Sequence, residues 1–85
     1  MKKFQLEIAA PDGKRFSGEV EQLSVRSIVG EVAILAGHLP YVTALAPGEC
    51  RVYVDGEIRR ADVTSGFLTV TPESVRLLST DFRWK

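Results

Sequence analysis

The chain has 85 residues, of which 45% are hydrophobic and 26% are charged, proportions that are typical of a globular domain and exclude a disordered or fibrous protein. Eleven basic residues balance eleven acidic ones, so the chain lacks the positive field that nucleic-acid binding requires, and we expect no nucleic-acid partner. The single cysteine, Cys50, excludes an internal disulfide and a multi-cysteine metal site. We therefore expect one small domain spanning residues 1–85, with Cys50 as a buried apolar residue of a strand.

The first residues give no sign of a targeting signal. Two lysines are followed by alternating apolar and polar residues, whereas a secretory signal has a continuous apolar region at that place. No stretch of the sequence approaches the ~20 apolar residues that a helix needs to span a bilayer. We expect a soluble, cytoplasmic protein without direct membrane insertion.

The dominant period along the chain is two residues, which is typical of β-strands with one buried face. It begins in "FQLEIAA" (4–10), where apolar and polar residues alternate. Proline, aspartate and glycine at positions 11–13 then predict a turn, because they favour fixed or positive φ angles and local side-chain hydrogen bonds.

The next two runs are less regular. In "GEVEQLSVRS" (18–27), Val20 has one parity and Leu23 the other, so either both faces are partly covered or, as we favour, a β-bulge shifts the register. The run "EVAIL" (31–35) is apolar on both parities and predicts a short strand that is buried on both faces.

The clearest local signal is "ECRVYVDGEIRRADV" (49–63). Asp55 and Gly56 are the pair that a two-residue type I′ turn requires, so the segment predicts a β-hairpin with Ala61 and Val63 on its inner face. The charged residues of this hairpin are interpreted as a solvated sheet edge that resists unwanted pairing.

A second hairpin is predicted where "GFLTV" (66–70) and "SVRLLS" (74–79) flank a proline-containing turn. Before it, "YVTALA" (41–46) is long enough for one helical turn. After it, the aromatic residues of "DFRWK" (81–85) either fold back on the domain or dock on another protein. Many short strands with regular turns predict an all-β fold, a small antiparallel β-sandwich or flattened barrel in a single domain.

The residues give little support to catalysis or to a phosphate-binding loop. His38 is the only histidine, and neither a nucleophile nor an orienting carboxylate nor further metal ligands can be assigned beside it. Gly30, Gly37 and Gly48 fit neither of the spacings known for phosphate-binding loops, so they are interpreted as turn residues. We expect no catalytic residue, no metal and no cofactor.

Several segments together resemble a known family. They are "FQLEIAAPDGKRFSGEVEQLSV" at the start, "GEVAILAGHLPYVTALAPG" (30–48) in the centre, and "TSGFLTV" and "PESVRLLS" near the end. The chain is similar, through almost its whole length, to the N-terminal β-sandwich domain of the epsilon subunits of bacterial F-type ATP synthases, called delta in mitochondria. The central block is the most specific part of the resemblance.

The resemblance implies a non-catalytic subunit of the central stalk. Such a subunit docks on the gamma subunit and on polar loops of the c-ring, and it couples proton- or sodium-driven rotation to ATP synthesis at the cytoplasmic face of the membrane. Carried over by position, the c-ring contact would comprise Gly30 and Glu31. The contact with gamma would comprise the segment that includes His38, Leu39, Pro40, Tyr41, Val42 and Thr43.

Bacterial members of the family continue into a C-terminal helical hairpin that inhibits ATP hydrolysis and in some bacteria binds ATP. The present sequence has no counterpart of that hairpin after position 79, as in a naturally short member or in a chain that stops at the domain boundary. We expect no ATP binding and no hairpin-based inhibition by this chain.

Two other classes of function are weighed against the stalk subunit. A free-standing β-sandwich that binds a ligand or peptide on a sheet face or edge is the main alternative. An enzyme is less favoured, because it would need His38 in a pocket with a shifted pKa and a partner carboxylate.

Overall fold

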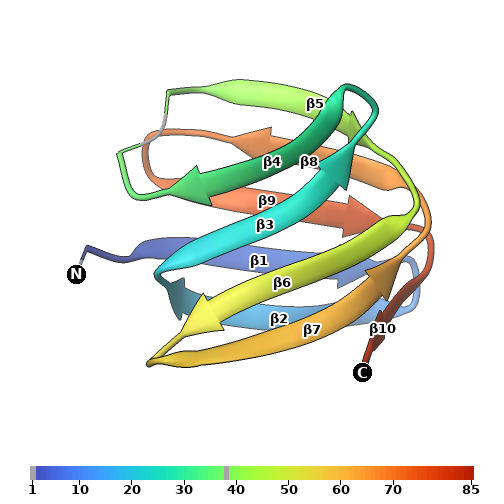
Figure 1. The fold of residues 1–85 in the computed structure, drawn as a ribbon, viewed down its shortest axis with the longest axis horizontal. Coiled ribbons are helices and arrows are strands. Elements are labelled where there is room, and N and C mark those ends of the chain that lie inside the picture. The colour runs from blue at the N-terminus through green and yellow to red at the C-terminus, as the bar shows by residue number, and fades with distance from the viewer. Residues whose placement is uncertain (1, 38) are drawn as a thin grey trace.

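The computed structural model describes residues 2–37 and 39–85, and the regular structure in these residues is strand throughout, as the alternating pattern predicts (Figure 1). The strands are β1 (Phe4–Ala10), β2 (Gly13–Val20), β3 (Gln22–Ser27), β4 (Gly30–Leu35), β5 (Tyr41–Leu45), β6 (Gly48–Val54), β7 (Glu57–Val63), β8 (Gly66–Val70), β9 (Ser74–Ser79) and β10 (Phe82–Trp84).

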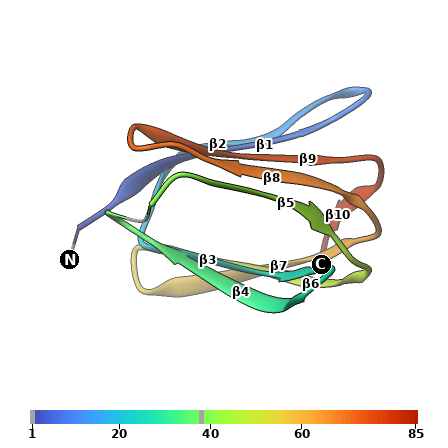
Figure 2. The same cartoon turned by 90° about the horizontal axis from the view of Figure 1, so that it is seen from above.

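The strands form two layers that face each other (Figure 2). Layer A has the order β10-β7-β6-β3-β4, and layer B has the order β5-β8-β9-β1-β2. The two layers are joined at one corner, where Ser27 at the end of β3 pairs with Leu45 at the end of β5. The predicted all-β sandwich is therefore confirmed. All paired strands are antiparallel except β1 and β9, which run parallel, a detail that the sequence pattern does not predict.

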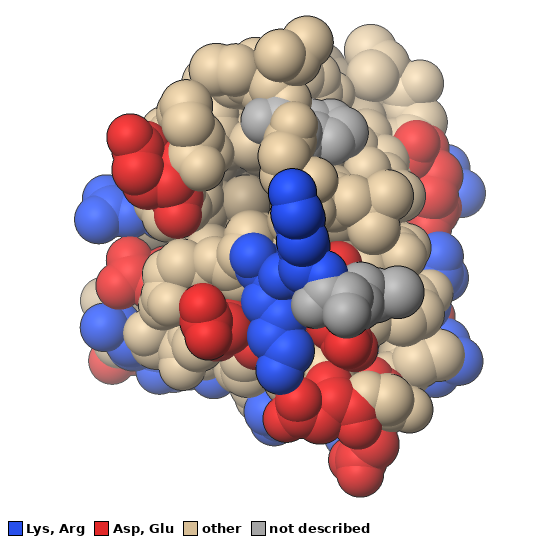
Figure 3. Space-filling view, turned by 90° about the vertical axis from the view of Figure 1, so that its left-hand side faces the viewer, with Lys and Arg blue, Asp and Glu red and all other residues tan. Residues whose placement is uncertain are grey.

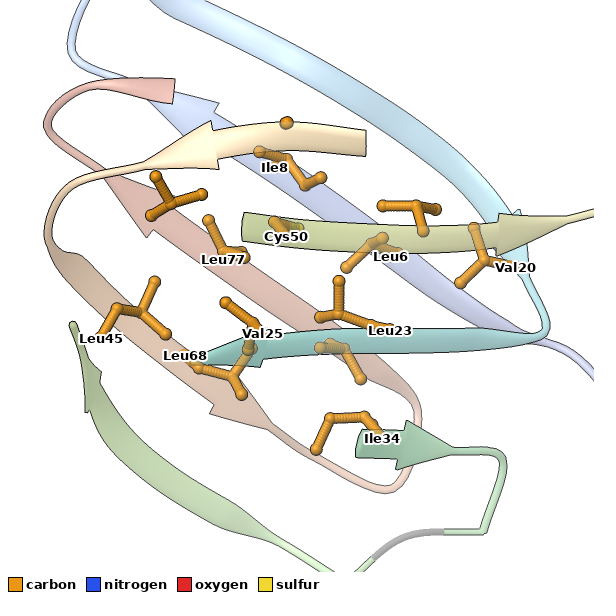
Figure 4. Close-up of a cluster of buried hydrophobic side chains, with 14 of the residues drawn as sticks. Leu6, Ile8, Val20, Leu23, Val25, Ile34, Leu45, Cys50, Leu68 and Leu77 are labelled. Atoms are coloured by element: carbon orange, nitrogen blue, oxygen red, sulfur yellow. The ribbon is translucent and has the colours of Figure 1, made fainter. Parts of the chain in front are cut away.

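The core lies between the layers, because each strand sends alternate apolar side chains inward (Figure 4). Leu23 of layer A and Leu6 and Leu77 of layer B are each fully buried in it. Cys50 is also fully buried, as predicted for a small apolar residue of a strand. Burial raises the pKa of its thiol to about 12, so Cys50 is not a reactive thiolate.

Both predicted hairpins are confirmed. In the β6–β7 turn, Asp55 has a φ of 51° and Gly56 a φ of 79°, as a type I′ turn requires. Ala61 and Val63 of the return strand are buried on the inner face. The β8–β9 pair joins residues 66–70 to residues 75–79 in antiparallel register.

The single helical turn for which residues 41–46 are long enough does not form. This segment forms β5, and its residues pair one by one with β8, from Tyr41 opposite Val70 to Leu45 opposite Gly66. A single helical turn satisfies few backbone groups, whereas the ladder with β8 pairs all five residues of β5 and turns alternate side chains toward the core.

Two further expectations about strand faces are wrong. The change of parity after Val20 is not a bulge, because the chain leaves layer B at the end of β2 and enters layer A at the start of β3. The strand at residues 31–35 is buried on one face only. Ile34 is fully buried, whereas Ala33 and Leu35 are exposed, because β4 is an outer strand of layer A and its outer face is open to solvent.

The C-terminal residues fold back on the domain as β10, which pairs with β7. The prediction that the 49–63 hairpin forms a sheet edge holds only in part, because β10 pairs with Ala61, Asp62 and Val63 and covers that part of β7. Trp84 also reaches the other layer: its indole N–H donates to the backbone carbonyl of Arg15 at 3.2 Å, and its ring packs edge-on against Phe16. The guanidinium of Arg59 lies 4.2 Å from the centre of the Trp84 ring. Trp84 thus links β10 of layer A to β2 of layer B.

Candidate docking surface

The outer face of layer B carries a row of apolar side chains that crosses four strands. The register places Ala44 of β5 opposite Phe67 of β8, Phe67 opposite Leu78 of β9, and Leu78 opposite Ala9 of β1. Their neighbours along the strands, such as Leu68 and Leu77, are buried, so the row must point outward. Phe67 is 58% exposed and Leu78 49% exposed.

This row forms the floor of an open groove of about 540 Å³. None of the described residues that line the groove is ionisable; they are Ala9, Ala10, Pro11, Ala44, Leu45, Ser65, Gly66, Phe67, Leu78, Ser79 and Thr80. At its rim the hydroxyls of Ser65 and Thr80 hydrogen-bond to each other at 2.8 Å. The groove is therefore suited to apolar side chains of a partner and offers no charged group to an ionic ligand.

Close backbone contact holds the groove in shape. Gly66 has a φ of +150°, and a Cβ atom built there would collide with the carbonyl oxygen of Leu78 and lie 2.8 Å from the Leu78 carbonyl carbon. Only glycine fits this approach of β8 to β9. Ser79, the residue of β9 that pairs with Gly66, adds a second contact between these strands: its hydroxyl donates to the Ser65 carbonyl at 2.9 Å.

The segment expected to contact gamma divides into two sets of residues. Leu39 is 79% and Val42 68% exposed, and Pro40 is also exposed. Tyr41 and Thr43 belong to the inner face of β5, and Tyr41 packs against the core, so their side chains point away from the outer face. His38 lies outside the described residues.

The residues expected to contact the c-ring lie at the start of β4. Gly30 has a φ of +126° and follows the β3–β4 turn. Glu31 is exposed, and its carboxylate accepts a hydrogen bond from the Arg51 guanidinium at 2.7 Å. The preceding turn exposes two large apolar side chains, since Ile28 is 67% and Val29 79% exposed.

The outer face of layer A carries a cluster of charged side chains around Arg51 and Glu49. Arg51 also lies 3.4 Å from Glu49, which accepts hydrogen bonds from Arg60 at 2.9 Å and from Lys85 at 3.0 Å. The hydrogen bonds from Lys85 and Arg60 lower the pKa of the Glu49 carboxyl. Such exposed pairs add little stability, but they keep this face unsuited to an apolar partner.

Charges of both signs also mix at the end of the molecule where the chain begins. Figure 3 shows basic side chains gathered in the middle of that end with acidic side chains beside them. The Lys3 ammonium there donates to the Asp55 carboxylate at 3.0 Å. Among the described residues no group of acidic, histidine and cysteine side chains could hold a metal ion, and no helix could cross a membrane.

The interpretation of single strands missed four exposed apolar residues, Phe67, Leu78, Ile28 and Val29. A signal was present, because "GFLTV" and "SVRLLS" carry apolar residues on both parities, which in a two-layered sandwich means that some of them face outward. The dipeptide Ile28-Val29 stands between two strands, where polar turn residues are more usual.

Comparisons with known proteins agree with the resemblance. A family model described as the β-sandwich domain of the ATP synthase delta/epsilon chain matches residues 3–85. The ATP synthase epsilon chain of Bacillus pumilus is 42% identical over 79 residues, which are 93% of this chain and 60% of that one. The epsilon chain of Caldicellulosiruptor saccharolyticus is 38% identical over 84 residues, 99% of this chain and 61% of that one. The chain thus spans about three fifths of the length of these relatives.

Solved structures show the same fold. A chain in the Euglena gracilis mitochondrial ATP synthase, in a structure of OSCP, F1 and the c-ring, matches with a TM-score of 0.90 and 25% identity, over 96% of this chain and 53% of that one. A chain in the Tetrahymena thermophila mitochondrial ATP synthase central stalk and c-ring matches with a TM-score of 0.81 over 95% of this chain and 66% of that one. At 12% identity the second match is evidence of fold alone.

Proposed function

The chain belongs to the delta/epsilon family of ATP synthase chains as their β-sandwich domain, and from this premise we propose that it is a non-catalytic subunit of the central stalk. It docks on the gamma subunit and on the loops of the c-ring, and it helps to couple ion-driven rotation to ATP synthesis. It acts as a peripheral protein at the cytoplasmic face of the membrane that holds the complex. A free-standing ligand- or peptide-binding sandwich has no support among the comparisons, since the relatives named above are chains of ATP synthases.

The observation that carries this proposal is the uncharged apolar groove on the outer face of layer B. Large apolar side chains that lie side by side on an exposed surface usually mark a site that contacts another protein. Phe67 and Leu78 are the large side chains of the apolar row. Val42 lies two residues before Ala44, a member of that row, and on the same outer face of β5. The segment expected to contact gamma and the groove therefore form one surface, which we assign to gamma.

The construction of this surface suits a subunit that must turn together with its neighbours. The groove lies on strands whose backbones are hydrogen-bonded to each other, so it keeps its shape without a partner. A preformed groove loses little conformational entropy when a partner docks, so more of the contact energy contributes to the binding affinity.

Titration calorimetry tests the proposal. The chain is titrated into a complex of the catalytic head with gamma that lacks epsilon, prepared from the same organism, and we expect saturable binding at one copy per complex. Phe67→Ser should weaken binding about tenfold or more, because a central aromatic residue of an interface carries a large share of the affinity.

Ile58→Ser is the matched control, since Ile58 is also apolar and 46% exposed but belongs to β7 in layer A. We expect it to bind like the wild type. Equal losses for both variants would contradict the assignment of the interface to layer B, and a folded wild-type chain that does not bind would contradict the stalk function itself.

A further inference from the structure

The outer edge of β4 is open in a way that the other strand edges of the sandwich are not. Apart from the ladder with β3, the backbone of residues 31–35 makes no hydrogen bond to another backbone group among the described residues. In an antiparallel ladder only alternate residues direct their N–H and C=O toward the partner strand, so the remaining groups of β4 point outward. Such an edge is a template for one further strand.

The other edges carry features that discourage pairing. β10 has only three residues, and the part of β7 that it leaves open, residues 57–60, contains three charged side chains. The β2 edge is interrupted at Arg15, which has no partner in β1 and whose carbonyl accepts from the Trp84 indole. The β5 edge is tied to layer A, because the Ala44 carbonyl accepts from the Ile28 N–H at 3.1 Å.

None of these features occurs in β4. Its ladder with β3 runs through six residue pairs without a register shift, and the strand contains neither proline nor lysine. The single charged residue, Glu31, is already bound to Arg51 of its own layer at 2.7 Å. The last four residues of the strand, 32–35, are apolar. A second strand can therefore pair with this edge without leaving an unpaired charge in the contact.

We propose that β4 of the free chain pairs with β4 of a second copy, antiparallel and about a twofold axis at Ala33. This inference goes beyond the proposed function. In this register Ala33 lies opposite Ala33 of the second copy and Glu31 opposite its Leu35, so no like charges meet. On the inner face Val32 lies opposite Ile34, and the two cores become continuous. The two strands exchange about six backbone hydrogen bonds.

The composition of the edge favours a second copy as the occupant. Ala33 at the centre is small and exposed, so two β4 strands approach without a steric or electrostatic conflict. Apolar side chains are exposed beyond both ends of the strand, since Val29 before it and Leu39 after it are each 79% exposed. A twofold axis places the start of one strand beside the end of the other, so these apolar groups come together twice.

Pairing and assembly into the complex exclude each other. Gly30 and Glu31, the residues expected to contact the c-ring, belong to the paired strand, so the pair is a state of the free chain. A contact one strand wide is smaller than the about 1,200–2,000 Å² of a stable interface, so the pairs are weak and dissociate on dilution. The pair therefore covers an edge that would otherwise recruit unrelated strands, and it releases the chain when a tighter partner is present.

Sedimentation velocity of the purified chain tests the pairing at concentrations from about 10 µM to about 1 mM, where weak contacts are populated. We expect the mass to rise from 9.4 kDa toward twice that value. Ala33→Lys sets two ammonium groups opposite each other at the axis and should raise the dissociation constant of the pair about fivefold or more. Ser17→Lys is the matched control, since Ser17 is an exposed small residue of β2, and it should leave the constant unchanged.

A charge exchange tests the register. Ala33→Glu should weaken the pair as Ala33→Lys does, because like charges again meet at the axis. An equimolar mixture of the two variants should associate at low ionic strength at least as strongly as the wild type, because opposite charges then face each other. Circular dichroism shows that each variant is folded, as expected for substitutions at exposed positions.

Several outcomes would overturn the pairing. A wild-type chain that stays monomeric over the whole range would do so, and so would equal weakening by Ala33→Lys and Ser17→Lys. Loss of the dimer in Phe67→Ser would place the contact in the groove of layer B instead of β4. A mixture of the two Ala33 variants that does not associate would contradict the axis at Ala33. The stalk function is tested separately by binding to the head with gamma, so failure of the pairing leaves it unaffected.

Discussion

Replacement of Gly66 by alanine tests the close approach of β8 to β9 beneath the groove. Alanine at a φ of +150° is strained by about 1–3 kcal/mol, since this region of backbone conformation is almost confined to glycine. The new methyl group also collides with the Leu78 carbonyl, and forcing extra atoms into a packed site costs typically about 1–3 kcal/mol more. The sum is a large fraction of the ~4–13 kcal/mol expected for a domain of this length.

The variant Gly13→Ala separates the cost of backbone strain from the cost of the steric collision. Gly13 has a similar φ of +142°, but a Cβ atom there meets nothing within 4 Å, so this variant should show the strain without the collision. Thermal unfolding followed by circular dichroism, with urea unfolding as a second measurement, should give Gly66→Ala the lower melting temperature by at least ~4 °C, as expected for 1 kcal/mol in a chain of this size. If Gly66→Ala is no less stable than Gly13→Ala, the argument from close contact is refuted.

Three further predictions concern single residues. Cys50 should resist a thiol reagent at pH 8 while the chain is folded and react at once in urea, because it is fully buried with a pKa of about 12; rapid labelling of the folded chain would contradict this. Trp84→Ala should reduce the free energy of unfolding by about 2–4 kcal/mol, and Trp84→Phe by about 1 kcal/mol, because phenylalanine keeps the ring but loses the indole hydrogen bond; equal losses in urea unfolding would show that the hydrogen bond dominates. The Glu49 carboxyl has a lowered pKa in the folded state, so its stabilising contribution is complete above the unfolded value of about 4.3 and is lost as the pH falls through the folded value. Melting temperatures between pH 3 and pH 6 should therefore depend less on pH in Glu49→Gln than in the wild type, and parallel curves would speak against this ionic contact.

Most of the strands could be predicted because their signals are local. The alternation in residues 4–10 and the Asp55-Gly56 pair determine a strand and a hairpin whatever lies across the core. The errors arise where a strand distant in sequence determines the secondary structure or the burial of a segment. Residues 41–45 become a strand because β8 is available to pair with them, and residues 31–35 keep one exposed face because no strand of the described residues covers it.

The sequence suggests a place in the chain for the candidate site but not the surface to which that place belongs. The resemblance assigns residues near Leu39 and Val42 to an interface, and the structure leaves both exposed. Phe67 and Leu78 come from a different part of the sequence, and only the register of β5, β8 and β9 brings them into line with Ala44. Alternation within one strand cannot reveal such a row, because the row runs across strands.

The parallel pairing of β1 with β9 has a consequence for folding during synthesis on the ribosome. Gln5 pairs with Ser74 and Ala9 with Leu78, so β1 cannot complete its pairing until β9 has left the ribosome. Until then the apolar face of β1 has only the β2 hairpin beside it, and two strands alone are barely stable in water. Layer B is therefore completed only after β9 has been made, and contacts between residues so distant in sequence make its folding slow. During synthesis, the core residues Leu6 and Ile8 of β1 therefore remain open to a chaperone until β9 emerges.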